Sequence, residues 1–163
     1  MSTLSYTTMK SPIGPLLLAG DEGGLRLVHF AAGRRPKSPQ HNWVVDEARF
    51  KEVIRQLEAY FEGKRKSFDL PLVLEGTEFQ LLVWRNLRKI SYGETVSYGQ
   101  LARRIGNPDS ARAVGLANGA NPIPIIIPCH RVIGSNGDLT GFGGGLPVKK
   151  KLLALETGQL SLL

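Results

Sequence analysis

Short apolar runs separated by turn-forming residues dominate the first thirty positions of the chain. Two such runs, residues 16–20 and 25–30, flank the sequence Asp-Glu-Gly-Gly. Apolar runs on either side of a glycine-rich turn are typical of paired strands, so the pattern predicts a β-hairpin. Residues 31–40 then combine glycine and proline with two arginines and a lysine, which predicts a basic loop.

An amphipathic helix is predicted next. Apolar side chains recur at helical spacing at Phe50, Val53, Ile54, Leu57 and Phe61. Asp46 is placed to cap the N-terminus of this helix, and Gly63 follows its last turn. A short strand is expected over residues 68–74. We therefore expect a small sheet with one packed helix, ending near Gly76.

From Thr77 onward the pattern becomes mostly helical. Thr77 with Gln80, and Ser97 with Gln100, have the spacing of capping boxes, so a helix is predicted after each pair. The second helix is short, because Gly106 follows its last apolar residue.

A third short helix is predicted over residues 111–117, after a turn at Asn-Pro-Asp and a cap at Ser110. Two short helices joined by a tight polar turn outline a helix-turn-helix, although an ordinary helical hairpin has the same outline. Its alanines and glycine would allow a close approach to another surface. Its one long cation, Arg112, lies near its N-terminus.

The last predicted helix begins at Pro147 and runs to Glu156, before Gly158. Residues 149–151 are all lysine, and we interpret them as a solvated face, with DNA contact as the alternative. The isoleucines at 125–127 predict a buried strand. The chain is thus expected to be α/β (α+β) in class.

Composition limits the class of protein. Of 163 residues, 42% are hydrophobic and 21% charged, which is typical of a globular domain. No segment approaches the roughly 20 apolar residues of a membrane helix, so we expect a cytoplasmic protein without membrane contact. A single cysteine excludes an internal disulfide. His29, His41 and His130 match no metal-ligand spacing, and no metal or other cofactor is expected.

The net charge of +7 is unevenly distributed. Residues 1–75 have a balance of +2, whereas residues 76–163 have a balance of +5. The second half is therefore the better candidate for binding a polyanion, although charge alone does not identify one.

The only cysteine lies in the sequence Pro128-Cys129-His130-Arg131. An ordinary thiol, with a pKa of about 8.5, is only a few per cent thiolate at neutral pH, so a nearby imidazole would matter for reactivity. The alternative is an inert, buried cysteine.

Residues 127–133, Ile-Pro-Cys-His-Arg-Val-Ile, resemble the active-site signature of the O6-alkylguanine-DNA alkyltransferases. Other segments stand in the family's order and spacing, namely Ser97-Tyr98-Gly99, residues 111–115, Asn-Pro-Ile-Pro at 121–124, the glycine-rich loop through Gly145, and Glu156. The resemblance covers the second half densely. The first half resembles the family in length, in its hairpin-plus-helix plan and in the segment at 76–80.

This resemblance implies two domains. Residues 1–76 would form an N-terminal α/β domain, similar to ribonuclease H. Residues 77–163 would form a winged helix-turn-helix domain that binds DNA and contains the active site.

The reaction implied by the resemblance moves an alkyl group from O6 of guanine, and by extension from O4 of thymine, to the Cys129 sulfur. No cofactor takes part. The resulting thioether is not displaced by water, so each protein molecule would act once. The implied partner is duplex DNA containing O6-alkylguanine, bound by a monomer, with cooperative binding as a further possibility.

The resemblance also assigns site residues. The catalytic residues would be Cys129, His130, Glu156 and Asn121. The substrate-binding residues would be Tyr98, Pro124, Val132, Phe142 and Gly143. The DNA-binding residues would be Ser97, Tyr98, Ala111, Arg112, Gly115 and Asn118.

Within these sets, the family pattern implies a water-bridged relay from Cys129 through His130 to Glu156. Neighbouring side chains do not normally face each other, which favours a bridge over direct contact. Arg112 would enter the duplex in place of the extruded base, and Tyr98 would help to rotate the nucleotide. Outside the resemblance, Glu156 would be read as a surface carboxylate, Arg112 as a phosphate contact and Tyr98 as a core aromatic.

Two departures from the family pattern leave the range of accepted alkyl groups open. Phe142 stands where some relatives have tyrosine, and Asn118 is polar where an apolar wall is common. A single cysteine excludes the family's phosphotriester-repair module. Two other functions remain as alternatives: a non-catalytic lesion sensor on the same scaffold, and a Cys-His hydrolase.

Overall fold

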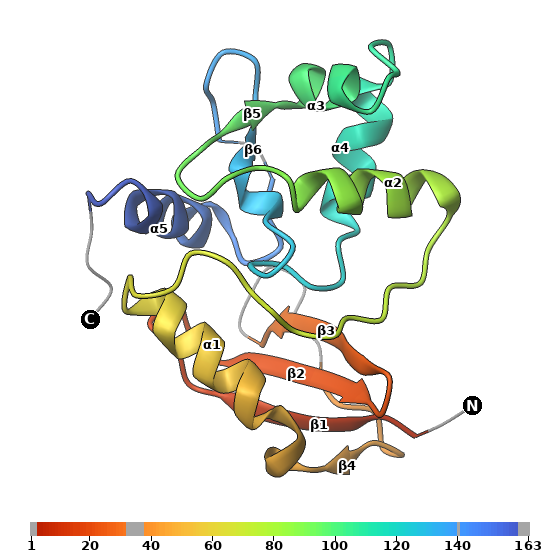
Figure 1. Cartoon of the computed structure of the whole chain (residues 1–163), viewed down its shortest axis with the longest axis vertical. Helices are drawn as coiled ribbons and strands as arrows, with labels where there is room; N and C mark the ends of the chain where they lie inside the picture. Colours follow the sequence, from red (N-terminus) through yellow and green to blue (C-terminus); the bar gives the residue numbers. More distant parts are fainter. Residues whose placement is uncertain (1–2, 32–37, 140, 160–163) are drawn as a thin grey trace.

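The computed structural model describes residues 3–31, 38–139 and 141–159 and has a mixed α/β fold (Figure 1). A four-stranded sheet with the order β3-β2-β1-β4 forms its first part. The strands are β1 (Ser5–Met9), β2 (Leu16–Asp21), β3 (Gly24–Phe30) and β4 (Val44–Val45). β2 pairs antiparallel with both β1 and β3, and β4 runs parallel to β1. Because β2 is central, five successive residues from Leu16 are buried, without polar alternation.

The hairpin predicted for residues 16–30 is confirmed as β2 and β3. Gly24 has a φ of +139°, and a Cβ at this position would lie 2.4 Å from the Pro71 carbonyl oxygen. Only glycine fits there. Strands β1 and β4 were not predicted as separate elements, and most of the predicted basic loop at 31–40 lies outside the described residues.

The strand predicted over residues 68–74 is wrong. Only an isolated bridge forms, between Leu25 and Leu72. Leu25 N donates to Pro71 O, and Val73 N donates to Leu25 O, both at 2.9 Å. Proline has no N–H to donate, so the ladder cannot extend through this segment.

The predicted amphipathic helix is confirmed as α1 (Lys51–Phe61), which packs against the sheet (Figure 1). Its entry is a 3₁₀ turn, η1 (Glu47–Phe50). Asp46 was predicted to cap the helix, but it caps this 3₁₀ turn instead: its side chain accepts a hydrogen bond from Arg49 N, whereas the N-cap position of α1 itself is Phe50, which makes no side-chain cap bond. Gly63, in the left-handed region with φ +76°, follows the helix.

The second part is mostly helical. Its elements are α2 (Glu78–Leu87), β5 (Val96–Ser97), α3 (Tyr98–Arg104), α4 (Ala111–Gly119), η2 (Cys129–Arg131), β6 (Val132–Ile133) and α5 (Leu146–Glu156). Both predicted capping boxes are present, at the starts of α2 and α3. Helices α3 and α4 pack together as the predicted pair, α2 packs on α4, and β5 pairs with β6.

Ser110 occupies the predicted cap position of α4, but its side chain makes no cap hydrogen bond. Its hydroxyl instead donates to Asn107 O at 2.7 Å, within the preceding turn. Serine side chains bond nearby carbonyls as readily as helix N–H groups, and the turn is the local competitor here.

Two predictions about burial and conformation also need correction. Residues 125–127 are buried but form no strand, because Ile125 has a φ of +74° and Ile127 N bonds back to Ile123 O. Lys149 is not part of a solvated face. Its side chain is fully buried, and its ammonium group donates to a backbone carbonyl.

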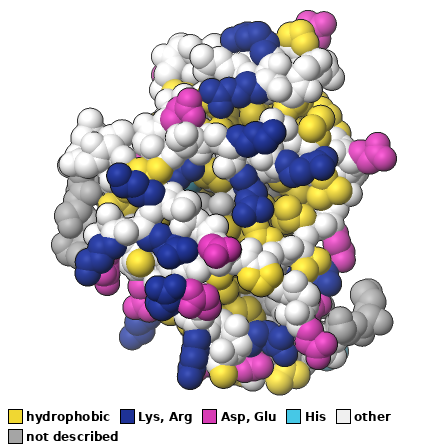
Figure 2. Space-filling view, viewed as in Figure 1, with side chains coloured by type: hydrophobic (Ala, Val, Ile, Leu, Met, Phe, Trp, Pro, Cys, Tyr) yellow, Lys and Arg dark blue, Asp and Glu magenta, His cyan; other side chains and the backbone are white. Residues whose placement is uncertain are grey.

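Lys and Arg side chains are spread over the full height of the face shown in Figure 2, with acidic side chains between them. Positive charge is therefore not confined to the second part of the chain on this face. Within residues 3–31, 38–139 and 141–159, no helix has the length and apolar character that a membrane span requires.

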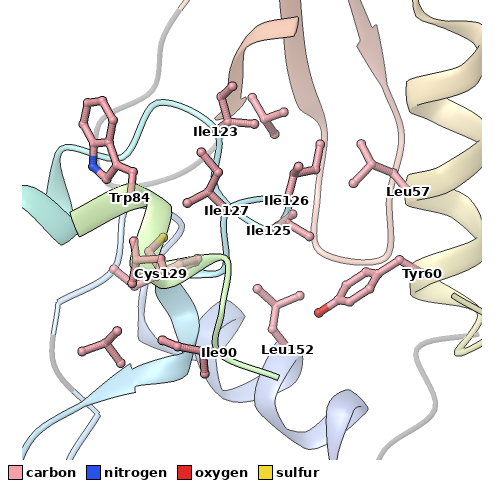
Figure 3. Close-up of a cluster of buried hydrophobic side chains, with 14 of the residues drawn as sticks. Leu57, Tyr60, Trp84, Ile90, Ile123, Ile125, Ile126, Ile127, Cys129 and Leu152 are labelled. Atoms are coloured by element: carbon pink, nitrogen blue, oxygen red, sulfur yellow. The ribbon is translucent and has the colours of Figure 1, made fainter. Parts of the chain in front are cut away.

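One hydrophobic core joins the two parts (Figure 3). Leu57 and Tyr60 reach it from α1, Trp84 from α2 and Leu152 from α5. The isoleucine-rich loop at 123–127 lies among them. This shared core places the residues after the loop, beginning with Cys129, between elements from both parts of the chain.

Candidate active site

Cys129 follows a loop that the Asn121 side chain holds in place. Asn121 Nδ2 donates to Ile127 O at 2.8 Å, and its Oδ1 accepts from Ile123 N at 3.0 Å. The loop contains Ile125, whose positive φ is rare for a β-branched residue and is maintained by such surrounding contacts. Cys129 therefore has a defined position at the start of η2, with 6% of its surface exposed.

Burial favours the neutral thiol form of Cys129. Burial raises the pKa of Cys129 to about 11, although a hydrogen bond from Asn121 and the charge of Lys149 both act to lower it. Since the thiolate is the nucleophile, a base must take the proton before or as the sulfur reacts.

The His130 imidazole, next in sequence to Cys129, is the candidate for such a base. Its Nε2 lies 2.7 Å from Glu156 Oε2, and both side chains are buried. The carboxylate favours the tautomer with the proton on Nε2. Nδ1 is buried and has no hydrogen-bond partner among the described residues, so its lone pair can accept a proton. Burial lowers the pKa of His130 and so favours the neutral ring, whereas Glu156 acts to raise that pKa.

Glu156 receives hydrogen bonds from four residues. Arg131 Nε donates to its Oε1 at 2.8 Å and Arg131 Nη2 to its Oε2 at 3.0 Å. Tyr60 donates to Oε2 at 2.6 Å, and Gly93 N donates to Oε1 at 3.2 Å. Burial acts to raise the pKa of Glu156, but the hydrogen bonds from His130 and Arg131 outweigh it and hold that pKa well below its usual range. Glu156 is therefore a fixed carboxylate rather than an exposed helix-end residue.

Two further polar side chains lie beside Cys129. Lys149 Nζ donates to Val132 O at 2.7 Å. Burial lowers the pKa of Lys149, while its charge acts on the Cys129 sulfur. Asn118 Nδ2 donates to Cys129 O at 3.4 Å, and its buried Oδ1 has no hydrogen-bond partner within the described ranges. Lys149 and Asn118 thus place polar groups against the backbone carbonyls of the segment that carries the thiol.

The residues predicted to contact DNA lie on α3, on α4 and at the end of β5. Tyr98 begins α3, and its ring is 3.6 Å from the position a Cβ would take at Gly115 of α4. Ala111 and the exposed Arg112 form the first turn of α4. Ser97 caps α3. Glycine at 115 therefore allows the aromatic ring to lie against the helix.

Apart from Tyr98 of α3, the predicted substrate-binding residues lie in three segments. Val132 lies in β6, where its carbonyl accepts a hydrogen bond from Lys149, and Pro124 is buried in the loop before Cys129. Gly143 is exposed, but Phe142 is not: its ring packs edge-on against Phe30 of β3, with centroids 5.3 Å apart. The glycine-rich loop is therefore anchored to the N-terminal sheet through Phe142.

The predicted catalytic residues form one constellation. Cys129, His130, Glu156 and Asn121 meet where the loop, η2 and α5 converge. No set of three or more His, Cys, Asp or Glu side chains in the described part of the chain could hold a metal ion. The arrangement can present a sulfur nucleophile, with a proton acceptor next in sequence and a carboxylate behind that acceptor.

Three residues of this constellation were not predicted from the sequence. Arg131 was noted only as part of the signature. Lys149 was interpreted as solvated, and Tyr60 was not considered. Tyr60 lies three residues after Leu57, so helical spacing indicates that it is buried, but no local pattern identifies a partner 96 positions away.

Comparisons with known proteins agree with this geometry. Two protein families match this chain. The family described as "6-O-methylguanine DNA methyltransferase, ribonuclease-like domain" matches residues 4–74, and the one described as "6-O-methylguanine DNA methyltransferase, DNA binding domain" matches residues 78–158. A methylated-DNA--protein-cysteine methyltransferase from Methanosarcina acetivorans is 58% identical over 93% of this chain and 97% of its own length.

Solved structures are similar over nearly the whole chain. The OGT of Mycobacterium tuberculosis, crystallised in complex with DNA, has a TM-score of 0.90 and 50% identity, covering 97% of this chain and 96% of that one. The O6-methylguanine-DNA methyltransferase of Pyrococcus kodakaraensis has a TM-score of 0.67 and 26% identity, with coverage of 94% and 99%. With its thiol, imidazole and carboxylate in one buried constellation, the chain belongs to the 6-O-methylguanine DNA methyltransferase family.

Proposed function

We propose that this protein repairs DNA by transferring an alkyl group from O6 of guanine to Cys129 Sγ, once per protein molecule. The observation that carries the proposal is the orientation of His130. One ring nitrogen is bonded to Glu156, and the other is left without a partner among the described residues, next in sequence to the only cysteine.

In the proposed reaction, the Cys129 proton passes to His130 Nδ1, with one water as the bridge. The sulfur electron pair then attacks the alkyl carbon, the carbon–O6 bond breaks, and the bond electrons stay on the guanine. The guanine takes up one proton from water, and the imidazolium returns the proton of Cys129 to water, so that protons balance. Lys149 and Asn121 favour the thiolate, and Glu156 stabilises the imidazolium. The product is a thioether, which water does not displace, so the protein is consumed.

Several features support duplex DNA as the substrate. The chain has a net charge of +7, α3 and α4 form a pair of short helices, and the similar Mycobacterium tuberculosis protein was crystallised with DNA. O6 lies within the base stack, so the nucleotide must be rotated out of the duplex. We assign Arg112, exposed on the first turn of α4, to the space that the base leaves.

The flipped base would be held by Tyr98 of α3 and by residues from the three segments described above. Tyr98 and the backbone of Cys129 and Val132 would bind guanine, and residues 141–145 would cover the leaving oxygen. Pro124 and Gly143 would shape this pocket. Ser97, Ala111, Gly115 and Asn118 would contact DNA or support the residues that do.

Mass spectrometry after incubation with duplex DNA containing O6-methylguanine tests the proposal. We expect the peptide containing Cys129 to gain one methylene mass, up to one methyl group per protein molecule, as the lesion is converted to guanine. Tight binding with an unchanged mass would instead identify a lesion sensor. Repeated turnover of an ester or amide without a stable adduct would identify a hydrolase.

An Arg112→Ala protein tests the role of α4. We expect the transfer rate from duplex DNA to fall by about a hundredfold, because base extrusion costs a few kcal/mol and Arg112 would offset part of that cost. Transfer from the free O6-methylguanine base should be unchanged. Arg55→Ala, on α1, removes the same charge from an exposed arginine and should leave both rates near those of the wild type. Equal losses with duplex and free base would contradict the assignment.

The proposal also covers location, assembly and domain organisation. The protein would be cytoplasmic, would act as a monomer and would bind cooperatively along DNA. Its two domains would divide near residue 76. The capping box at Thr77 supports that division. O4-alkylthymine is included as a second substrate, because its alkyl group is also carried on an exocyclic oxygen.

A further inference from the structure

The carboxylate of Glu156 is shared by two parts of the chain that are far apart in sequence. His130, Arg131 and Glu156 itself all belong to the second part. Tyr60 comes from α1, 96 residues before Glu156, and its hydroxyl lies 2.6 Å from Glu156 Oε2. Figure 3 shows the Tyr60 side chain reaching from α1 toward Leu152 of α5. The N-terminal sheet-and-helix part therefore contacts the proton relay directly.

We propose that Tyr60 is a positioning residue, which competes with His130 for Glu156 Oε2 and so limits the negative charge that the carboxylate presents to the imidazole. The inference rests on the proposed function, since it concerns the base of that reaction. It makes the N-terminal part of the chain a component of the reaction centre, in addition to its role in packing.

Three hydrogen-bond donors compete for Glu156 Oε2. This oxygen lies within 3.0 Å of donors on Tyr60, His130 and Arg131. A carboxylate oxygen has two lone pairs, so three donors must share them. Removing the tyrosine donor strengthens the bond from His130, and a stronger bond to the carboxylate favours the protonated imidazole.

Tyr60 is the donor in its hydrogen bond to Glu156. Tyr60 is fully buried, and burial together with the Glu156 charge raises its pKa well above the usual value. The phenol therefore keeps its proton and can only donate to the carboxylate. Hydrogen bonds between a neutral donor and an ionised acceptor are stronger than neutral pairs, so this one has a measurable effect on the oxygen it reaches.

The surroundings of the relay contain few other ionisable groups among the described residues. The ionisable groups that contact the His130–Glu156 pair, or act on it electrostatically, come from four parts of the chain. They are Tyr60 from α1, Tyr92 from the segment before β5, Cys129 and Arg131 from η2, and Lys149 and Glu156 itself from α5. Arg131 and Lys149 lower the pKa of His130, whereas Glu156 raises it. Tyr60 differs from these cations because it acts on the imidazole only through the carboxylate.

A Tyr60→Phe protein tests the inference by the pH dependence of single-turnover methyl transfer, from about pH 5 to about pH 9. The neutral imidazole accepts the proton, so the rate rises with pH as His130 loses its own. In the variant we expect this rise to move to higher pH, with a rate roughly three- to tenfold lower at about pH 6 and no loss at about pH 8. The His130 ¹⁵N resonances, followed without DNA, should titrate at correspondingly higher pH.

Tyr92→Phe is the matched control. Tyr92 belongs to the same aromatic cluster, with its ring 6.2 Å from that of Tyr60, but its hydroxyl lies 3.5 Å from Leu155 O and does not bond Glu156. Its removal should leave the pH profile unchanged. A wild-type profile for Tyr60→Phe, or an equal shift for Tyr92→Phe, would overturn the inference.

Incorporation of 3-fluorotyrosine at position 60 covers the case in which Tyr60→Phe does not fold. Its more acidic hydroxyl is a stronger donor, so the rise in rate should move to lower pH, opposite to the phenylalanine variant. No movement, or movement to higher pH, would contradict the inference. If wild-type Cys129 is never methylated, the proposed function itself fails; if methylation proceeds and the profiles coincide, only the role of Tyr60 fails.

Discussion

A Cys129→Ser protein is expected to bind duplex DNA containing O6-methylguanine and to remove no methyl group from it. The serine hydroxyl loses its proton far less readily than a thiol, and its oxygen is a poorer nucleophile toward saturated carbon. Mass spectrometry of the protein and analysis of the DNA, over the time in which the wild type reacts to completion, provide the measurement.

The substitution also has a structural effect that must be separated from chemistry. Cys129 is 6% exposed, and an unsatisfied hydroxyl at this position costs about 1–3 kcal/mol of unfolding free energy. Cys129→Ala removes the sulfur without adding a polar atom and serves as the second variant. Both proteins should retain affinity for the duplex. Methyl removal by either one would refute Cys129 as the acceptor.

A Glu156→Gln protein is expected to lose both stability and transfer activity. The substitution leaves the Arg131 guanidinium buried, with 7% of its side chain exposed, without a charged partner. Breaking a buried pair in this way costs about 3–5 kcal/mol of unfolding free energy. The imidazolium that forms during transfer also loses its carboxylate, so we expect a rate loss of about a hundredfold or more. Denaturant unfolding and single-turnover kinetics at a temperature where the variant is folded measure the two effects.

Glu94→Gln is the matched control for Glu156→Gln. Glu94 pairs with Arg104 at 3.2 Å, but 40% of its side chain is exposed, and such surface pairs contribute about 0–1 kcal/mol. Equal stability losses for the two variants would contradict the buried network.

The pH dependence of stability provides a second check. The folded state holds the pKa of Glu156 well below the ordinary value of about 4.3. The contribution of Glu156 to the unfolding free energy is therefore complete above that value and is lost as the pH falls through the folded pKa.

The accuracy of the sequence predictions depended on the range of the interactions involved. The boxes at Thr77 and Ser97 were predicted correctly, because a capping box forms between residues three positions apart. The strand at 68–74 failed, because its pairing depends on which backbone groups of Leu25 and Pro71 meet in space. At Ser110 two local partners competed, and the turn carbonyl took the hydroxyl.

The same distinction applies to the site. The resemblance assigned Glu156 to His130 as a partner, and the two side chains lie 2.7 Å apart. The water bridge between Cys129 and His130 stays a prediction. The burial of Lys149 was missed because three consecutive lysines have no apolar periodicity, and only the packing of α5 against η2, with the bond from Lys149 to Val132 O, shows which one is enclosed. The Tyr60 contact with Glu156 has no signal in either segment alone.

The sequence by itself determined the helices with their caps, the hairpin and the presence of one nucleophile beside an imidazole, because these depend on nearby residues and on side-chain chemistry. Only the tertiary structure decided which protonation state is favoured for each group of the site. Burial disfavours the Cys129 thiolate and the His130 imidazolium, and donors from two parts of the chain keep Glu156 ionised. The physical reason is that desolvation and hydrogen bonding set these equilibria, and both depend on segments that only folding brings together.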